Sequence, residues 1–304
     1  MSGARSGDQG GSPRVAPRAI IVRQTSSRIQ NMSCLSRREN RRIFPVPLSS
    51  KGVEMALSCS FLVATTSLTL LAPHQTALAS PDPVTVMEKL MTPGNGVTTS
   101  AKWKFWLSDR PATSTITFHT TGVLAFGKGR AVAADATRLS SGGRKVRFRV
   151  VGGRTYASGG AWSDMLPQGK TWARSSILDY QPYEFTEQDI NIFEPTTLRE
   201  LLKSARSDRG TTTTRYSGSI TVKALCAVSP SCRSEYGKKV NADISWQLWT
   251  NEKGQVVRLF AKWVLAKTAK NPISSNTEAD TSYSGWGSRV SVSVPPANQV
   301  AKVD

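Results

Sequence analysis

Hydrophobic and polar residues alternate with a period of two along most of the second two-thirds of the chain. The clearest run is 144–150, where apolar residues hold one phase and cations the other: Val146, Phe148 and Val150 against Lys145, Arg147 and Arg149. Such alternation predicts a half-buried β-strand. Comparable runs predict strands at 115–119, 154–157, 244–248, 257–265 and 290–294.

Short polar turns separate several of these strands. Gly152-Gly153 lies between two of them, and Asn251-Glu252-Lys253-Gly254 lies between two others. Turns of this length join antiparallel neighbours, because parallel strands need a long crossover connection. The pattern therefore predicts an antiparallel sheet.

Two segments have helical spacing instead. Residues 83–91 begin at Pro83, keep apolar residues on one face and stop at Pro93-Gly94. Pro195 opens a second helix, in which leucines recur at helical spacing. The predicted fold class is α+β, a large curved antiparallel β-sheet with one or two helices packed on it.

The first third of the chain predicts export. Residues 1–54 are rich in Gly, Ser, Pro and Arg and lack a sustained hydrophobic period, and an apolar stretch follows at 56–72. Ala77-Leu78-Ala79 then precedes Ser80. A basic region, an apolar region and a small-x-small site make up a secretory signal peptide. We expect a disordered leader at 1–54, a signal peptide at 55–79, cleavage between Ala79 and Ser80, and one β-rich domain at 80–304.

Other interpretations of this region are weaker. A membrane anchor would be a short and polar one, because the apolar stretch has 17 residues and is interrupted by serines and threonines. Cys59 lies at the beginning of the stretch rather than at its end, which argues against lipid acylation. The long leader suggests a true start codon downstream, at Met32 or Met55. The Arg37-Arg38 pair hints at twin-arginine export, but no apolar run follows it closely.

Charge and cysteine content agree with an exported domain. Residues 80–304 hold 30 Lys/Arg against 18 Asp/Glu, a net charge of +12, which favours anionic surroundings such as acidic lipid or wall polymer. Cys226 and Cys232 are the only cysteines after the cleavage site, and Ser-Pro-Ser between them favours a turn that joins them in a disulfide. A zinc site would need more ligands than one histidine supplies, and a redox pair normally has two intervening residues.

Motifs for catalysis are missing from the domain. Its single histidine, His119, lies on the polar phase of a strand, and there is no nucleophile elbow, P-loop or metalloprotease signature. A carboxylate pair could form among several scattered acids, but their spacing gives no support for one: Asp164, Asp179, Glu184, Glu187 and Asp189. We expect no enzyme, no cofactor and no metal. Nucleic acid is also not expected as a partner, because no aromatic residues interleave with the cations of strand 144–149 on their own face.

Apolar residues of the sheet are candidates for a pocket. The domain has eight tryptophans, whose ordinary role is core packing. Two helices leave part of a large apolar sheet face uncovered, and such a face forms a pocket for an apolar ligand. Strand phase selects Val146, Phe148, Val150, Ile244, Trp246, Leu248, Leu259 and Trp263 as candidates for this face.

Several short strings between residues 100 and 265 occur in a familiar order. They are Thr155-Tyr156 followed by Gly169-Lys170-Thr171-Trp172, the Pro195–Leu202 helix, Thr214-Arg215-Tyr216-Ser217-Gly218, and Trp246-Gln247-Leu248-Trp249 leading to Gly254 and Arg258. Their order resembles the actinobacterial lipid-carrying lipoproteins and the wider lipoprotein-carrier fold. The resemblance implies a half-barrel with helices over its mouth and a cavity for acyl chains. The family's lipobox cysteine is absent, and the Cys226/Cys232 segment is an insertion relative to the family.

Together these features predict a secreted or envelope-facing monomer that carries a lipid or other apolar ligand without catalysis. The alternative is a non-catalytic cell-envelope interaction protein whose sheet is fully packed and whose basic surface contacts an anionic membrane or wall polymer. An enzyme that uses carboxylates is the third hypothesis.

Overall fold

A computed structural model describes residues 81–111, 114–236, 240, 242–266 and 273–303. The predicted leader, the signal peptide and the Ala79/Ser80 cleavage site lie outside the described residues. Within the described ranges, no helix has the length and apolar character needed to cross a membrane.

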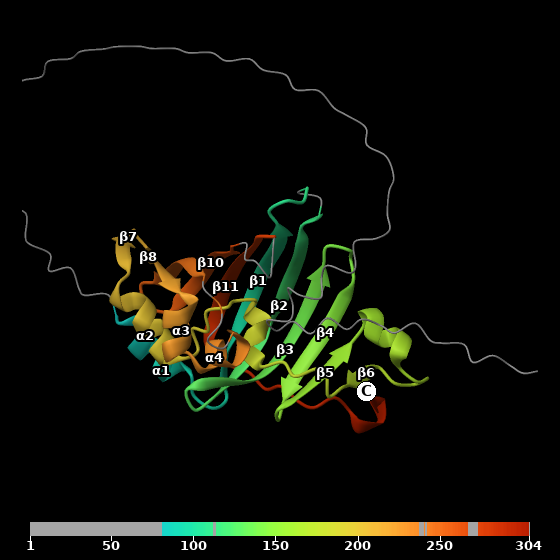
Figure 1. Ribbon diagram of the computed structural model, residues 1–304. Coiled ribbons are helices and arrows are strands. Elements are labelled where there is room, and N and C mark those ends of the chain that lie inside the picture. The colour runs from blue at the N-terminus through green and yellow to red at the C-terminus, as the bar shows by residue number, and fades with distance from the viewer. Residues whose placement is uncertain (1–80, 112–113, 237–239, 241, 267–272, 304) are drawn as a thin grey trace, which may run out of the picture.

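The described residues form a single large curved sheet that does not close into a barrel (Figure 1). Its order is β12-β6-β5-β4-β3-β2-β1-β11-β10-β9-β8-β7. The strands are β1 (Asn95–Leu107), β2 (Ile116–Gly127), β3 (Arg130–Ser140), β4 (Lys145–Val151), β5 (Arg154–Ser158), β6 (Trp172–Arg174), β7 (Arg206–Arg209), β8 (Thr213–Thr221), β9 (Asp243–Asn251), β10 (Val256–Leu265), β11 (Ser275–Arg289) and β12 (Val300–Lys302). The α+β half-barrel is confirmed.

Neighbouring strands pair antiparallel, except that β12 runs parallel to β6. The hairpin predicted at Gly152-Gly153 is present, and both glycines have positive φ, which a two-residue turn of this kind requires. The predicted strand at 290–294 is wrong. Asn95 at the start of β1 pairs with Arg289, so β1 offers no further residue to pair with beyond it. The chain leaves the sheet there and runs to the 3₁₀-helix η6 (Ala297–Gln299) and β12.

Both predicted helices are present, as α1 (Pro83–Leu90) and α2 (Pro195–Lys203). Asp82 caps α1, because its carboxylate accepts the backbone N–H groups of Val84 and Thr85 at 3.3 and 3.0 Å. In Figure 1 these helices lie with α3 and α4 beside the β7–β10 end of the sheet. We call the sheet face that packs against them the concave face.

The expected disulfide is present and joins two short helices rather than closing a simple turn. Cys226 lies in α3 (Val222–Val228) and Cys232 in α4 (Pro230–Tyr236), with an S–S distance of 2.02 Å. Pro230 starts α4, and Ser229 Oγ accepts the backbone N–H of Cys232 at 3.2 Å. A proline in the first turn and a serine before it are the signals that begin a helix.

The chain between β6 and α2 packs on the concave face over β1, β2 and β3. This segment contains the 3₁₀-helix η5 (Pro182–Thr186) and places four large apolar side chains in the core, each at most 2% exposed: Phe185, Ile190, Ile192 and Phe193. Phe193 packs against Phe126 and Trp286, with ring centroids 5.7 and 6.1 Å apart. The core therefore consists of apolar side chains from this segment as well as from the sheet.

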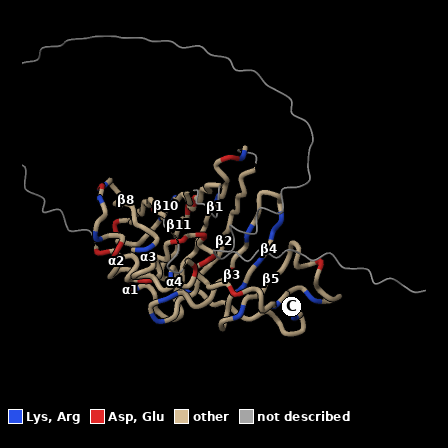
Figure 2. Tube along the Cα trace, in the orientation of Figure 1, with Lys and Arg blue, Asp and Glu red and all other residues tan. Residues whose placement is uncertain are grey.

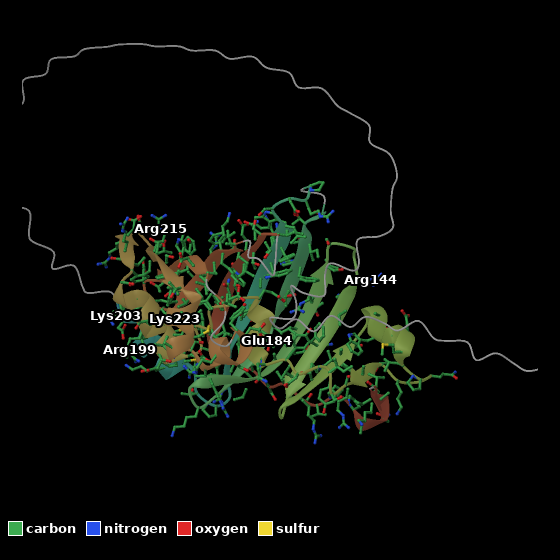
Figure 3. All side chains as sticks on the ribbon, viewed as in Figure 1. Arg144, Glu184, Arg199, Lys203, Arg215 and Lys223 are labelled. Atoms are coloured by element: carbon green, nitrogen blue, oxygen red, sulfur yellow. A yellow bond between two sulfur atoms is a disulfide. The ribbon has the colours of Figure 1, made fainter. Side chains whose placement is uncertain are left out.

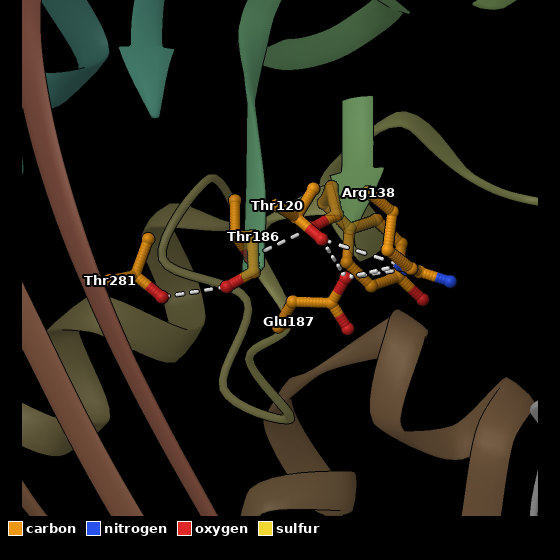
Figure 4. A network of polar contacts seen from close by, with 6 residues as sticks. Thr120, Arg138, Thr186, Glu187 and Thr281 are labelled. Carbon is orange, nitrogen blue, oxygen red and sulfur yellow. Dashed lines mark hydrogen bonds and ion pairs between the residues drawn. The ribbon is translucent and has the colours of Figure 1, made fainter. Parts of the chain in front are cut away.

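Buried polar contacts fix this segment to the sheet (Figure 4). Glu187 Oε1 accepts from Thr120 Oγ1 of β2 at 2.7 Å and from Arg138 Nε of β3 at 2.8 Å. Gln188 donates to the Leu259 carbonyl and to Thr281 Oγ1, at 2.9 and 2.8 Å. Residues 187–188 thus bind β2, β3, β10 and β11, and we call these contacts the polar anchor. Glu187 itself has a left-handed φ of 57°, a conformation that a non-glycine residue rarely adopts.

We expect Glu187→Gln to lower the free energy of unfolding by about 3–5 kcal/mol, because it leaves the buried Arg138 guanidinium without a compensating charge. Arg138→Met/Glu187→Leu should cost much less than this, since both charges leave together. Urea unfolding followed by circular dichroism measures both variants.

Asp208→Asn is the matched control, because Asp208 pairs with Arg215 on the exposed surface at 3.1 Å. Removing an exposed pair should cost less than about 1 kcal/mol. Equal unfolding midpoints for Glu187→Gln and Asp208→Asn would contradict the role given to the polar anchor.

Candidate ligand-binding cleft

A cleft of about 450 Å³ opens on the concave face where β2, β3 and β4 approach the β3–β4 turn. This volume lies within the range of small-molecule sites. Its lining is Phe118, Arg138, Ser140, Ser141, Gly142, Arg144, Val146, Phe148, Ala161 and Trp162.

Strand register explains why these residues meet. Phe118 of β2 lies opposite Ser140 of β3, and Arg138 of β3 lies opposite Val146 of β4. Side chains directly opposite each other in a sheet point to the same face. The period-two pattern of β4 therefore places Val146 and Phe148 on the concave face.

The 3₁₀-helix η4 (Gly160–Met165) forms the opposite wall of the cleft and carries Ala161 and Trp162. Gly159 and Gly160, both with positive φ, pack directly on the start of β4. A Cβ atom would come within 2.8 Å of the Lys145 carbonyl oxygen at Gly159, and within 2.8 Å of a Val146 methyl at Gly160. Only glycines let η4 turn back this closely over the sheet.

An aromatic row continues from the cleft along the concave face. Phe118 stacks on Trp103 of β1 with ring centroids 5.4 Å apart, and Trp103 lies 5.9 Å from Phe105. Leu107 and Ile116 pack against this group, which is a separate cluster from the main core. The apolar surface at this end of the sheet therefore extends beyond the cleft itself.

Arg138 places a positive charge among the aromatic rings of the cleft. Its guanidinium carbon lies 5.5 Å from the ring centres of both Phe118 and Phe148. Burial alone would lower the pKa of Arg138, but the charge and hydrogen bond of Glu187, together with those of Tyr180, outweigh it and hold the pKa above its ordinary value. Arg138 is thus a neutralised, permanently ionised part of the floor.

The structure separates the eight residues predicted to line a cavity. Val146 and Phe148 line the cleft. Trp246 lines a second and more polar cleft of about 450 Å³ near β8, together with Arg206, Gln247 and several serines. The other five line neither cleft: Val150, Ile244, Leu248, Leu259 and Trp263. Phe148 and Trp246 are buried in the core as well.

The basic phase of β4 lies on the opposite, outer face, where acids largely compensate it. Asp135 of β3 accepts from Arg147 Nε and Arg149 Nε, each at 2.8 Å. Both guanidinium groups also lie over Trp172, 5.9 and 5.0 Å from the ring centre. Lys and Arg follow β4 in Figure 2, but two of the three predicted surface cations are held by Asp135.

The same arrangement recurs on the outer face. Arg258 covers Trp249 and pairs with Asp280, and Lys262 covers Trp106 and pairs with Glu278. Each of these indoles is shielded by a cation that an acid holds in place. Three of the eight tryptophans, Trp106, Trp172 and Trp249, therefore lie on the outer face of the sheet under cations. The ordinary role expected from the sequence was core packing.

The acids considered for catalysis have structural partners in several cases. Glu187 belongs to the polar anchor, Glu184 accepts the backbone N–H of Gln181 at 3.0 Å, and Asp189 accepts a hydrogen bond from the Tyr236 hydroxyl. His119 is exposed and lies 3.3 Å from Ser100 Oγ. No group of three or more metal-ligating side chains occurs among the residues that the structure describes.

Comparisons with known proteins leave the family open. No family model matches the chain, and no curated protein matches it in sequence. A solved DUF1329 family protein from Desulfovibrio piger is 10% identical, with a TM-score of 0.26 over 66% of this chain and 88% of that one. A LolA superfamily protein from Nitrosomonas europaea is 8% identical, with a TM-score of 0.23 over 67% and 90% of the two chains. Likenesses this distant do not assign the chain to a family.

Asp135 should make stability depend on pH. Burial raises its pKa, but hydrogen bonds from Arg147 and Arg149 outweigh burial and hold the pKa of Asp135 below its usual value. A carboxylate with a lowered folded pKa stabilises the fold above the unfolded pKa of about 3.9, and this contribution is lost as pH falls through the folded pKa.

We therefore expect Asp135→Asn to lower the free energy of unfolding by about 1–2 kcal/mol near neutral pH, a range that allows for partial exposure of the pair. The difference from the wild type should shrink as the pH falls below about 4. Urea unfolding across this pH range measures it, with the exposed Asp164→Asn as control. A difference that stays constant with pH would show that Asp135 acts through packing rather than charge.

Proposed function

We propose that this protein is an exported, non-catalytic carrier of a lipid or other apolar ligand, bound in the cleft beneath β2, β3 and β4. The single observation that carries the proposal is the cleft itself. Phe118, Val146, Phe148 and Trp162 give it apolar walls on the concave face of the half-barrel, whereas the cleft near β8 is more polar. Sites for apolar ligands combine such walls with a few polar groups.

Export is supported by two independent features. The sequence of residues 55–79 has the parts of a signal peptide, and Cys226 and Cys232 form a disulfide. Disulfides persist in oxidising compartments outside the cytosol. We place the protein at the outer face of the cell envelope or in the medium. The resemblance to actinobacterial lipid-carrying lipoproteins belongs to the same proposal.

The second candidate function is a cell-envelope interaction protein with a packed sheet. One specific observation favours it, since seven of the eight residues expected to line a cavity are buried in the core, Val146 being the exception. The outer face, however, offers less free positive charge than strand 144–149 suggests, because Asp135 binds both Arg147 and Arg149. An anionic partner on that face would have to compete with Asp135.

The first test is native mass spectrometry of the exported protein purified from its own host, followed by organic extraction. We expect reproducible adducts that extract as lipid, because an apolar cleft exposed to a lipid-rich envelope fills with ligand. A mass equal to that of the protein without any adduct, together with no binding of fluorescent fatty-acid probes, would contradict the carrier hypothesis and favour the interaction protein.

Ala161→Trp tests whether the cleft holds the ligand. Ala161 is exposed at the wall of the cleft, so a larger side chain fills the space without entering the core. We expect at least tenfold weaker binding of the probe. Leu139→Trp is the matched control, because Leu139 is an exposed residue of β3 on the outer face. Equal losses in both variants would place the ligand elsewhere.

A further inference from the structure

Arg144 shares the concave phase of β4 with the apolar wall of the cleft. It lies two residues before Val146 and four before Phe148, whereas Lys145, Arg147 and Arg149 occupy the other phase. Arg144 lines the cleft next to the β3–β4 turn. In Figure 3 it lies far from the other labelled cations, Arg199, Lys203, Arg215 and Lys223, which gather at the β7–β8 end.

The Arg144 guanidinium makes no hydrogen bond or ion pair with any residue that the structure describes, although its backbone is fixed. The Arg144 carbonyl accepts the backbone N–H of Ser140 at 3.0 Å, and its own N–H donates to Ser140 Oγ at 3.2 Å. The turn thus holds the Arg144 backbone in place at the cleft while its five N–H donors stay available to a ligand.

Arg138 and Arg144, the two arginines that line the cleft, differ in burial and in charge compensation. Arg138, deep in the floor, is buried and neutralised by Glu187, with a side chain only 8% exposed. Arg144, at the mouth, is exposed and has no acid within 4 Å among the described residues. Val146 lies opposite Arg138 in the β3–β4 ladder, and Val146, Phe148 and Phe118 form the apolar part of the lining. The cleft is therefore apolar inside and cationic at its entrance.

We propose that the ligand of this cleft is an amphiphile with one anionic head, a carboxylate or a phosphate monoester, held by the Arg144 guanidinium. Its hydrocarbon part lies against Phe118, Val146, Phe148 and Trp162. A guanidinium binds the paired oxygens of either head through two parallel hydrogen bonds. This inference rests on the proposed carrier function and names the class of ligand.

The test compares three probes of one chain length on the full chain expressed in its host: palmitic acid, its methyl ester and hexadecyl phosphate. Delipidated protein is titrated with each probe and followed by native mass spectrometry. We expect the acid and the phosphate to bind at least tenfold more tightly than the ester. In Arg144→Gln this preference should disappear while binding of the ester stays unchanged, which also shows that the variant is folded.

Two further variants separate charge from other effects. Arg144→Lys should keep most of the preference, because it retains the positive charge. Arg154→Gln, an exposed cation at the β4–β5 turn, should leave the preference intact. Inorganic phosphate is added as a competitor. If inorganic phosphate displaces the acid and hexadecyl phosphate, and the hydrocarbon chain adds nothing to their affinity, the ligand is a free anion. That result would overturn the amphiphile.

Equal binding of acid and ester to the wild type, with no effect of Arg144→Gln, would overturn the anionic head and leave the carrier function standing. Failure of all three probes to bind would overturn the carrier function and the inference together. The two failures are therefore distinguishable in one titration series.

Discussion

A guanidinium and a carboxylate removed from water inside a half-barrel must neutralise each other, and the concave face is organised around this requirement. Arg138 reaches inward from β3 and meets Glu187, which arrives on the chain between β6 and α2. Because an unpaired charge would be strongly destabilising there, this chain segment is held at one depth and in one register. Its phenylalanines and isoleucines then fill the core, and the space that they leave over β2, β3 and β4 is the cleft.

The two faces of the sheet use arginine for different purposes. On the concave face the ion pair of Arg138 with Glu187 holds the segment between β6 and α2 among aromatic rings. On the outer face Arg149 and Arg258 lie flat on tryptophans while Asp135 and Asp280 hold them. The sheet thereby covers its outer indoles with polar side chains instead of a second layer of helices. A high net charge on this domain does not translate into an equally large free basic surface.

The sequence predicts β2, β4, β5, β9, β10 and the two main helices, because each has a regular hydrophobic period, but it does not predict the long central strands β1, β3 and β11. The period of two places Val146 and Phe148 on one phase of β4, and the same rule adds Arg144, which the sequence alone does not mark as a ligand-binding group. The sequence also does not predict which apolar positions stay open. The segment around Phe185 and Phe193 has no hydrophobic period, so the sequence does not show that it fills the core. Glu187 looks like an ordinary loop acid in the sequence, because its partner Arg138 is distant along the chain. The error at 290–294 is similar, because an alternating pattern does not reveal whether a partner strand exists.

The pairing of β1 with β11 has a consequence for the order of folding. Asn95 pairs with Arg289, so the centre of the sheet joins residues from opposite ends of the domain. Contacts between residues so distant in sequence form late, because the entropy of closing the long intervening chain must be overcome first. A ribosome that has released only the first half of the described residues therefore holds a set of hairpins in which β1 still lacks its partner β11. The β1–β11 seam and the contact of Gln188 with Thr281 in the polar anchor can form only after β11 has emerged.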